Sequence, residues 1–191
     1  MNKRLSTLLF SPLVVLASAA MALTAYGQSF INQKNITLEA AQIAAQAALD
    51  ECDSLSAIPV SVAIVDRAGV LKTQLRQDGA GPHTTDSSFR KAYTAASLKR
   101  ATGDLANAVV GTENENLQDM NDNVLVLRGG VPIVHPSGEV IGGIGVGGKP
   151  FGSTDEACAI AGRDAITPGE MQSQSGPPAG SVRVVGPEGA W

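Results

Sequence analysis

The spacing that most resembles a cofactor motif lies in the glycine-rich segment 142–149, which reads GGIGVGGK. Gly143, Gly145 and Gly148 have the spacing of a dinucleotide-binding fingerprint, and residues 143–149 resemble a phosphate-binding loop. The fingerprint must open a first βαβ unit, but this segment belongs to the last predicted strand. A phosphate-binding loop needs Ser or Thr where Pro150 stands. We therefore interpret the segment as a β-strand whose glycines allow close approach of backbone or ligand.

Catalytic constellations are sparse elsewhere in the chain. Its two histidines are His83 and His135, and neither an HxxxH nor an HExxH spacing occurs. One protomer therefore has too few suitably spaced histidines to build a zinc site from them. A GxSxG nucleophile elbow is also missing, and the serines near the histidines are interpreted as structural. These residues favour a binding protein over an enzyme.

Four basic residues fall in one predicted helix, at positions 90, 91, 99 and 100. The helical repeat sends them in widely separated directions, so they form no basic stripe. We interpret the helix as solvated, although one of these cations could meet a carboxylate ligand.

The chain contains two cysteines, Cys52 and Cys158. They fall near the end of the first predicted helix and the start of the last one. An exported protein can form a disulfide between them, and two buried thiols fit the helical pattern equally well. Pairing cannot be deduced from spacing, so both alternatives stay open.

The N-terminus has the pattern of a signal peptide. Lys3 and Arg4 precede an apolar run over residues 5–17 that is shorter than the roughly 20 residues needed to span a bilayer. Cleavage after Ala22 or after Gly27 satisfies the small-x-small rule. We expect a signal peptide at residues 1–27, a periplasmic or secreted mature protein, and no membrane insertion after cleavage.

Charge narrows the range of partners. The chain has 14 Lys and Arg against 18 Asp and Glu, a net charge of −4, and loss of the two cations in residues 1–27 would make it −6. An acidic protein lacks the electrostatic attraction that nucleic acid or an anionic membrane requires. We therefore predict no nucleic-acid partner.

Hydrophobic periodicity and turn residues divide the remainder into one domain over residues 28–167 and a flexible Pro/Gly-rich tail over 168–191. Predicted helices cover 37–52, 87–102 and 153–166, and residues 103–122 are interpreted as a solvated connection. Five strands are predicted, at 60–66, 70–75, 123–128, 131–135 and 140–146. The order α-ββ-α-βββ-α predicts an α+β fold with a mainly antiparallel five-stranded sheet flanked by helices.

Five sequence blocks in this order resemble the GlcG/HbpS-like family, which includes the C-terminal domain of PduO-type proteins. The likeness covers about residues 36–166. The blocks are VAIVD at 62–66, RQDGA at 76–80, RKAYTA at 90–95, GGVPI at 129–133 with GEVIGGIGV at 138–146, and DEACA at 155–159. Departures from the family pattern occur at Gln77 and at Gly147-Gly148.

The resemblance implies a homo-oligomer, often an octamer, and heme bound at a partly exposed site. On that basis His83 is the preferred axial ligand to heme iron, with Arg90 and Lys91 nearby for the heme propionates. His135 is the alternative ligand, although a turn histidine bonded to backbone is its ordinary role. Heme degradation is implied by the resemblance alone. An enzyme or accessory protein acting on a small carboxylate or aldehyde remains the alternative function.

Overall fold

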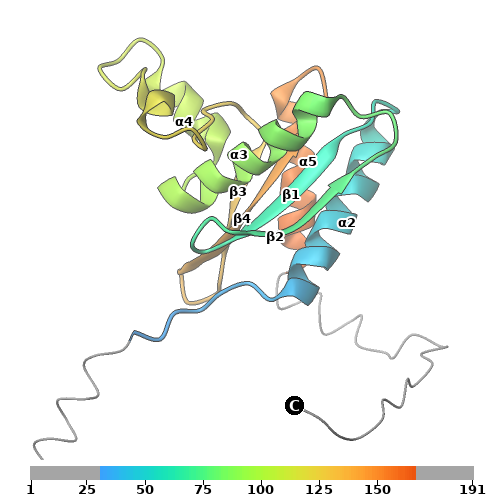
Figure 1. Ribbon diagram of the computed structural model, residues 1–191, viewed down its shortest axis with the longest axis horizontal. Coiled ribbons are helices and arrows are strands. Elements are labelled where there is room, and N and C mark those ends of the chain that lie inside the picture. Colours follow the sequence, from blue (N-terminus) through green and yellow to red (C-terminus); the bar gives the residue numbers. More distant parts are fainter. Residues whose placement is uncertain (1–30, 167–191) are drawn as a thin grey trace, which may run out of the picture. The chain divides into compact units, whose positions relative to one another are not determined.

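The computed structural model describes residues 31–166, and the predicted signal peptide and C-terminal tail lie outside them. The helices are α2, α3, α4 and α5, with one 3-10 turn, η1 (Figure 1). Their bounds are Leu38–Leu55, Pro82–Leu98, Thr102–Val109 and Gly152–Asp164, and η1 covers Leu117–Met120. The strands β1 to β4 are Ser61–Asp66, Leu71–Arg76, Gly130–Val134 and Val140–Gly147.

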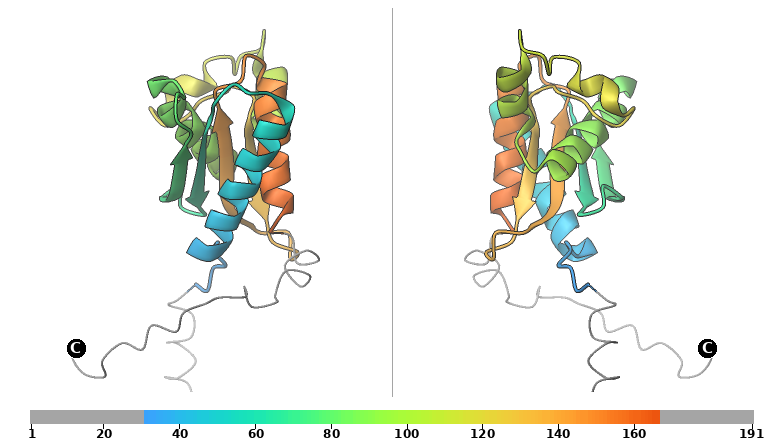
Figure 2. Two further views of the ribbon diagram at one scale, coloured as in Figure 1. Left: turned by 90° about the vertical axis from the view of Figure 1, so that its right-hand side faces the viewer. Right: turned by 90° about the vertical axis from the view of Figure 1, so that its left-hand side faces the viewer.

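The strands form one antiparallel sheet in the order β2-β1-β4-β3. Helices α2 and α5 lie side by side on one face of this sheet, and α3 covers the other face (Figure 2). The predicted α+β fold with an antiparallel sheet between helices is confirmed. No helix among residues 31–166 is long and apolar enough to cross a membrane.

The sheet has four strands within the described residues, so the prediction of a fifth at 123–128 is wrong. The amides of Asn123 and Val124 donate to Asn121, and two further backbone groups of this segment bond to side chains of α3 instead of to a neighbouring strand. The amide of Leu125 donates to Thr94 Oγ1 at 2.8 Å, and Arg90 Nη2 donates to the carbonyl of Val124 at 2.9 Å. An apolar run satisfied in this way stays beside the helix and outside the sheet.

The predicted helix at 87–102 differs from α3 at both ends. Helix α3 begins at Pro82, where the missing N–H of proline costs no hydrogen bond, and it ends before Lys99, which adopts a left-handed conformation with φ of 54°. His83 therefore lies in the first turn of a helix and not in a loop. A further helix, α4, follows because Leu105 and Val109 are buried, so only part of the predicted connection is solvated.

The two faces of the sheet are packed in different ways. Toward α2 and α5, branched side chains such as Val62, Ile64 and Ile144 form the main core. Toward α3, β4 presents Gly143 and Gly145, where an added Cβ would collide with the carbonyl oxygens of Ala92 and Ser88. The glycine strand thus lets the backbone of α3 lie directly on the sheet, as the close-approach interpretation predicts.

A disulfide joins Cys52 of α2 to Cys158 of α5, which resolves the alternative left open by the sequence. Both residues are fully buried where the two helices meet. The bond closes a sequence separation of 106 residues and ties the first helix of the described fold to the last.

A buried ion pair links the two sides of the sheet. Lys91 of α3 donates from Nζ to Asp155 Oδ2 and to the carbonyl of Val146, each at 2.8 Å, and both charged side chains are 3% exposed. Asp155 Oδ1 accepts from the backbone amide of Lys149 at 3.0 Å. Burial raises the pKa of Asp155, and the neighbouring Lys91 ammonium opposes that rise. Contrary to the interpretation of a solvated helix, Lys91 is a core residue.

Breaking the disulfide is expected to lower the free energy of unfolding by about 4–5 kcal/mol, because it frees a long loop in the unfolded chain. Urea unfolding of the wild type with and without reductant, and of a Cys52→Ala/Cys158→Ala double variant, measures the loss. Thiol titration of the unfolded, unreduced protein should find no free thiol. Two thiols per chain would contradict the bond.

Replacing Lys91 with Met should cost about 3–5 kcal/mol, because it leaves the Asp155 carboxylate buried without its counter-charge. Urea unfolding at neutral pH measures this loss. Asp86→Asn is the matched control, since it removes the exposed pair between Asp86 and Arg90, at 3.5 Å, and should cost less than about 1 kcal/mol.

The loss in the Lys91→Met variant should also grow with pH. Without the ammonium, burial raises the pKa of Asp155 further above its value in the unfolded chain. A raised carboxyl pKa leaves stability intact below the unfolded pKa and lowers stability as pH rises toward the folded pKa. Equal losses at about pH 4 and about pH 8 would show that Asp155 does not carry the effect.

Candidate functional site

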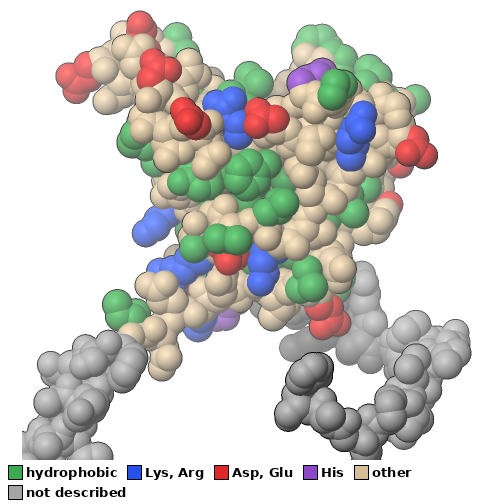
Figure 3. All heavy atoms as spheres, viewed as in Figure 1, with side chains coloured by type: hydrophobic (Ala, Val, Ile, Leu, Met, Phe, Trp, Pro, Cys, Tyr) green, Lys and Arg blue, Asp and Glu red, His purple; other side chains and the backbone are tan. Residues whose placement is uncertain are grey.

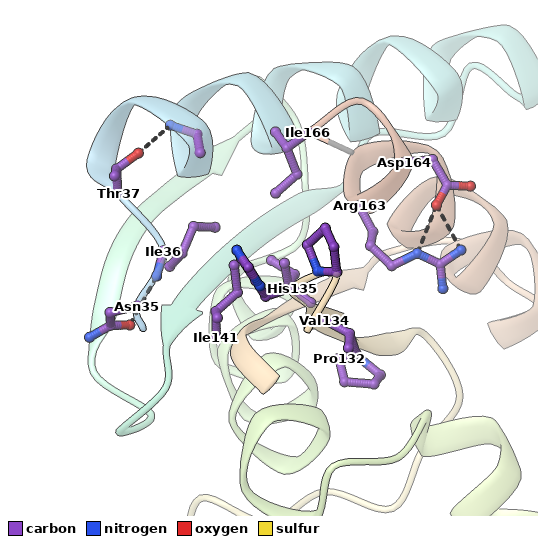
Figure 4. A pocket seen from close by; sticks show the side chains of 13 residues that line it. Asn35, Ile36, Thr37, Pro132, Val134, His135, Ile141, Arg163, Asp164 and Ile166 are labelled. Carbon is purple, nitrogen blue, oxygen red and sulfur yellow. Dashed lines mark hydrogen bonds and ion pairs between the residues drawn. The ribbon is translucent and has the colours of Figure 1, made fainter. Parts of the chain in front are cut away.

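A cavity of about 500 Å³ opens at the end of the domain where the β3–β4 turn meets the start of α2 (Figure 4). Its volume falls in the range of small-molecule sites. Hydrogen bonds from the amide of Ile36 to the carbonyl of Ile141, at 3.1 Å, and from the amide of Arg67 to Asn35 Oδ1, at 3.0 Å, hold the chain before α2 against the sheet. The apolar lining residues are Ile36, Ala40, Pro132, Ile133, Val134, Pro136, Ile141 and Ile166.

His135 is half-buried and lines this cavity. Its Nδ1 lies 3.0 Å from the backbone N–H of Ser137 and 3.3 Å from the ammonium of Lys34. Both of these groups can only donate, so Nδ1 must be the acceptor and Nε2 carries the proton of the neutral ring. The predicted role of a turn histidine bonded to backbone is confirmed. His135 thereby offers a hydrogen-bond donor from Nε2 instead of a lone pair.

Polar groups beside His135 form a connected network. Glu139 lies 3.4 Å from Lys34 and 3.3 Å from Arg67, and it accepts from the Ser137 hydroxyl at 3.0 Å. The Ser137 hydroxyl, with Lys34 and Arg67 beside it, holds the pKa of Glu139 below its ordinary value. At the far rim Arg163 pairs with Asp164 at 2.8 Å. Each carboxylate near the cavity therefore already has a cation within ion-pair distance.

His83 lies far from this cavity, at the start of α3. It is exposed and has no hydrogen-bond partner among residues 31–166. Figure 3 shows the two histidine side chains at opposite ends of the view. The structure thus separates the two candidate ligands and does not bring them into one site.

The two cations proposed to accompany His83 differ in availability. Arg90 is 29% exposed, and its guanidinium donates to the carbonyl of Val124 and approaches Asp86 at 3.5 Å. Lys91 is buried and already holds Asp155 and Val146, which leaves it unable to reach an exposed ligand. Only Arg90 remains near the surface. The described residues contain no group of three His, Cys, Asp or Glu side chains placed to hold a metal ion.

Sequence reasoning missed the cavity and its rim residues Lys34 and Arg163. One signal was present, because Pro136-Ser137-Gly138 predicts a turn, and a tight turn brings His135 and Glu139 side by side, as the bond from the His135 amide to the Glu139 carbonyl at 2.8 Å shows. Nothing in the sequence placed Lys34, more than a hundred positions away, beside His135.

Comparison with known proteins identifies close relatives of this fold. Residues 36–164 match the family described as "Haem degrading protein HbpS-like". A double variant of Streptomyces reticuli HbpS is 40% identical, with a TM-score of 0.66 over 71% of this chain and 90% of its own. The PduOC:heme complex is 26% identical, with a TM-score of 0.63 over 69% of this chain and 94% of its own.

A Citrobacter freundii protein of 15.0 kDa, encoded in the dhaT-dhaS intergenic region, is 36% identical over 115 residues. The alignment covers 59% of this chain and 80% of that protein. The family match takes in all four strands and the helices on both faces of the sheet. The resemblance predicted from the sequence is thus confirmed, and the chain belongs to the HbpS-like family.

Proposed function

We propose that this chain is an exported heme-binding protein that sequesters, senses or transfers heme. The observation that carries the proposal is the likeness to PduOC, a relative of the same fold whose structure is that of a heme complex. Support for export comes from the signal-peptide pattern of residues 1–27, which is typical of periplasmic or secreted proteins.

Hydrogen bonding favours His83 over His135 as the axial ligand. Iron needs a nitrogen lone pair, and the exposed His83 ring can supply one from either nitrogen. His135 Nε2 carries a proton, and ligation through it would cost the bond from the Ser137 amide. The residues around His83 therefore fit heme better. Bound heme would supply the redox-active iron, and His83 would hold it.

Arg90 is positioned to assist His83. It follows His83 by seven residues, so the two side chains share one side of α3 about 10 Å apart along the axis. This separation suits an imidazole at the iron and a guanidinium at a propionate. Lys91, which the sequence also suggested for this role, remains in the core pair with Asp155.

His83→Ala is expected to shift the Soret maximum of bound hemin, or to weaken hemin binding about tenfold or more, which is about 1.4 kcal/mol. Absorbance titration with hemin measures both effects. His135→Ala is the matched control and should leave the spectrum unchanged. The reverse pattern would move the iron to the other end of the sheet.

We further propose that the protein forms a homo-oligomer, with an octamer as the size suggested by the family resemblance. Hydrophobic side chains gather in the middle of one face (Figure 3). Where α3 meets the β1–β2 turn, the rings of Phe89 and Tyr93 lie 6.2 Å apart, Tyr93 covers Gly69 of that turn, and Val70 is 60% exposed. Such a patch suits contact between copies of the chain.

Light scattering at micromolar concentration should give a mass several times that of the protomer. Tyr93→Glu should shift the distribution toward smaller species, because it places a charge in the proposed contact. A monomer mass for the wild-type protein would contradict the assembly.

A further inference from the structure

We propose that the cavity at His135 binds a small monocarboxylate with an apolar body, at a site separate from heme. The proposal does not depend on heme binding, because the cavity and His83 lie at different ends of the domain. It rests on three features of the described residues: the apolar walls, the fixed proton on His135, and the balance of charge at the rim.

The walls select an apolar body. Ile36, Ile133 and Ile166 are at most 8% exposed and fix the shape of the cavity. A ligand that lies against these walls, within a cavity of about 500 Å³, gains the free energy of removing its own apolar surface from water. Figure 4 shows side chains from the start of α2, the β3–β4 turn and the end of α5 around this space.

His135 selects a hydrogen-bond acceptor. Its Nδ1 is occupied by the Ser137 amide and by Lys34, so the ring has only its Nε2 proton left to offer a ligand. A carboxylate accepts such a bond more strongly than a neutral group does. A ligand that instead needs an acceptor from the protein would leave this donor unsatisfied.

Charge at the rim selects a single negative charge. The charged side chains that line the cavity, or that are connected to lining residues by hydrogen bonds, are three cations and two carboxylates. Together they carry one positive charge in excess. The low pKa of Glu139 keeps its carboxylate charged and bound to Lys34 and Arg67, so it does not compete for the ligand position. The cations are Lys34, Arg67 and Arg163, and the carboxylates are Glu139 and Asp164.

Calorimetric titration of the purified chain with octanoate near neutral pH tests the proposal. We expect saturable one-to-one binding, and binding of 1-octanol, which has the same body without the charge, about tenfold weaker or more. His135→Phe removes the donor and should weaken octanoate by a similar factor while changing octanol little. His135→Gln keeps a neutral N–H donor and should stay within about threefold of wild type.

Matched controls separate this site from the heme site. His83→Phe should leave octanoate binding unchanged, and saturating octanoate should leave hemin titration unchanged. If hemin fails to bind at all, the octanoate result still stands. Ala40→Phe should abolish binding of both octanoate and octanol by filling the cavity, with circular dichroism reporting that the fold is kept.

Three results would overturn the proposal. Equal affinity for octanoate and octanol would show that charge plays no part. Displacement of octanoate by hemin would make the cavity the heme site. Binding that appears only after removal of residues 167–191 would assign the cavity to the chain's own C-terminal segment.

Discussion

The architecture of this protein depends on how the Lys91 ammonium is satisfied after it leaves water. A buried charge must find a counter-charge and hydrogen bonds, and Lys91 obtains them from β4 and α5 at once, through Val146 and Asp155. Asp155 then binds the amide of Lys149, whose own ammonium donates to three carbonyls at the C-terminal end of α2, those of Cys52, Ser56 and Ile58. The ion pair, extended by Lys149, therefore links α2, α3 and α5 to β4.

Glycine makes this arrangement sterically possible. At Gly129 an added Cβ would lie 2.9 Å from Lys91 Nζ and 2.8 Å from the Cβ of Asp155, and the backbone there has a φ of 122°. Gly129, together with Gly143 and Gly145 on the side of β4 that faces α3, lets α3 lie close enough to the sheet for the Lys91 side chain to reach Asp155 of α5. The disulfide and the main core hold the opposite face, so the two layers are fastened by different chemistry.

The two ends of the domain, at the start of α3 and at the β3–β4 turn, differ in their chemistry. Near the start of α3, His83 is exposed, and Arg90 lies farther along the same helix. At the other end, the β3–β4 turn and the segment before α2 enclose an apolar space with a donor histidine. The two histidines therefore differ among the described residues: His135 has donors fixed at its Nδ1 and presents a proton from Nε2, whereas neither ring nitrogen of His83 is engaged.

Much of the fold follows from local pattern. The helix predicted to begin at residue 37 does begin there, because Thr37 caps α2 by accepting from the amide of Ala40 at 3.2 Å. The strands predicted at 60–66 and 70–75 pair as an antiparallel hairpin. The five sequence blocks were sufficient for the family. These features depend on neighbours a few residues apart, or on a linear motif, and the chain carries that information directly.

The tertiary structure alone decided the features that depend on distant partners. Residues 123–128 were predicted as a strand, but backbone groups of Leu125 and Val124 bond to Thr94 and Arg90 of α3, and the segment lies outside the sheet. The sequence pattern of its helix does not predict whether Lys91 is solvated or buried. Its burial depends on the ion pair with Asp155, which lies 64 positions away in the chain. The cysteine pairing and the state of His135 were open for the same reason: burial and protonation are properties of a residue's surroundings, and the fold assembles those from remote parts of the chain.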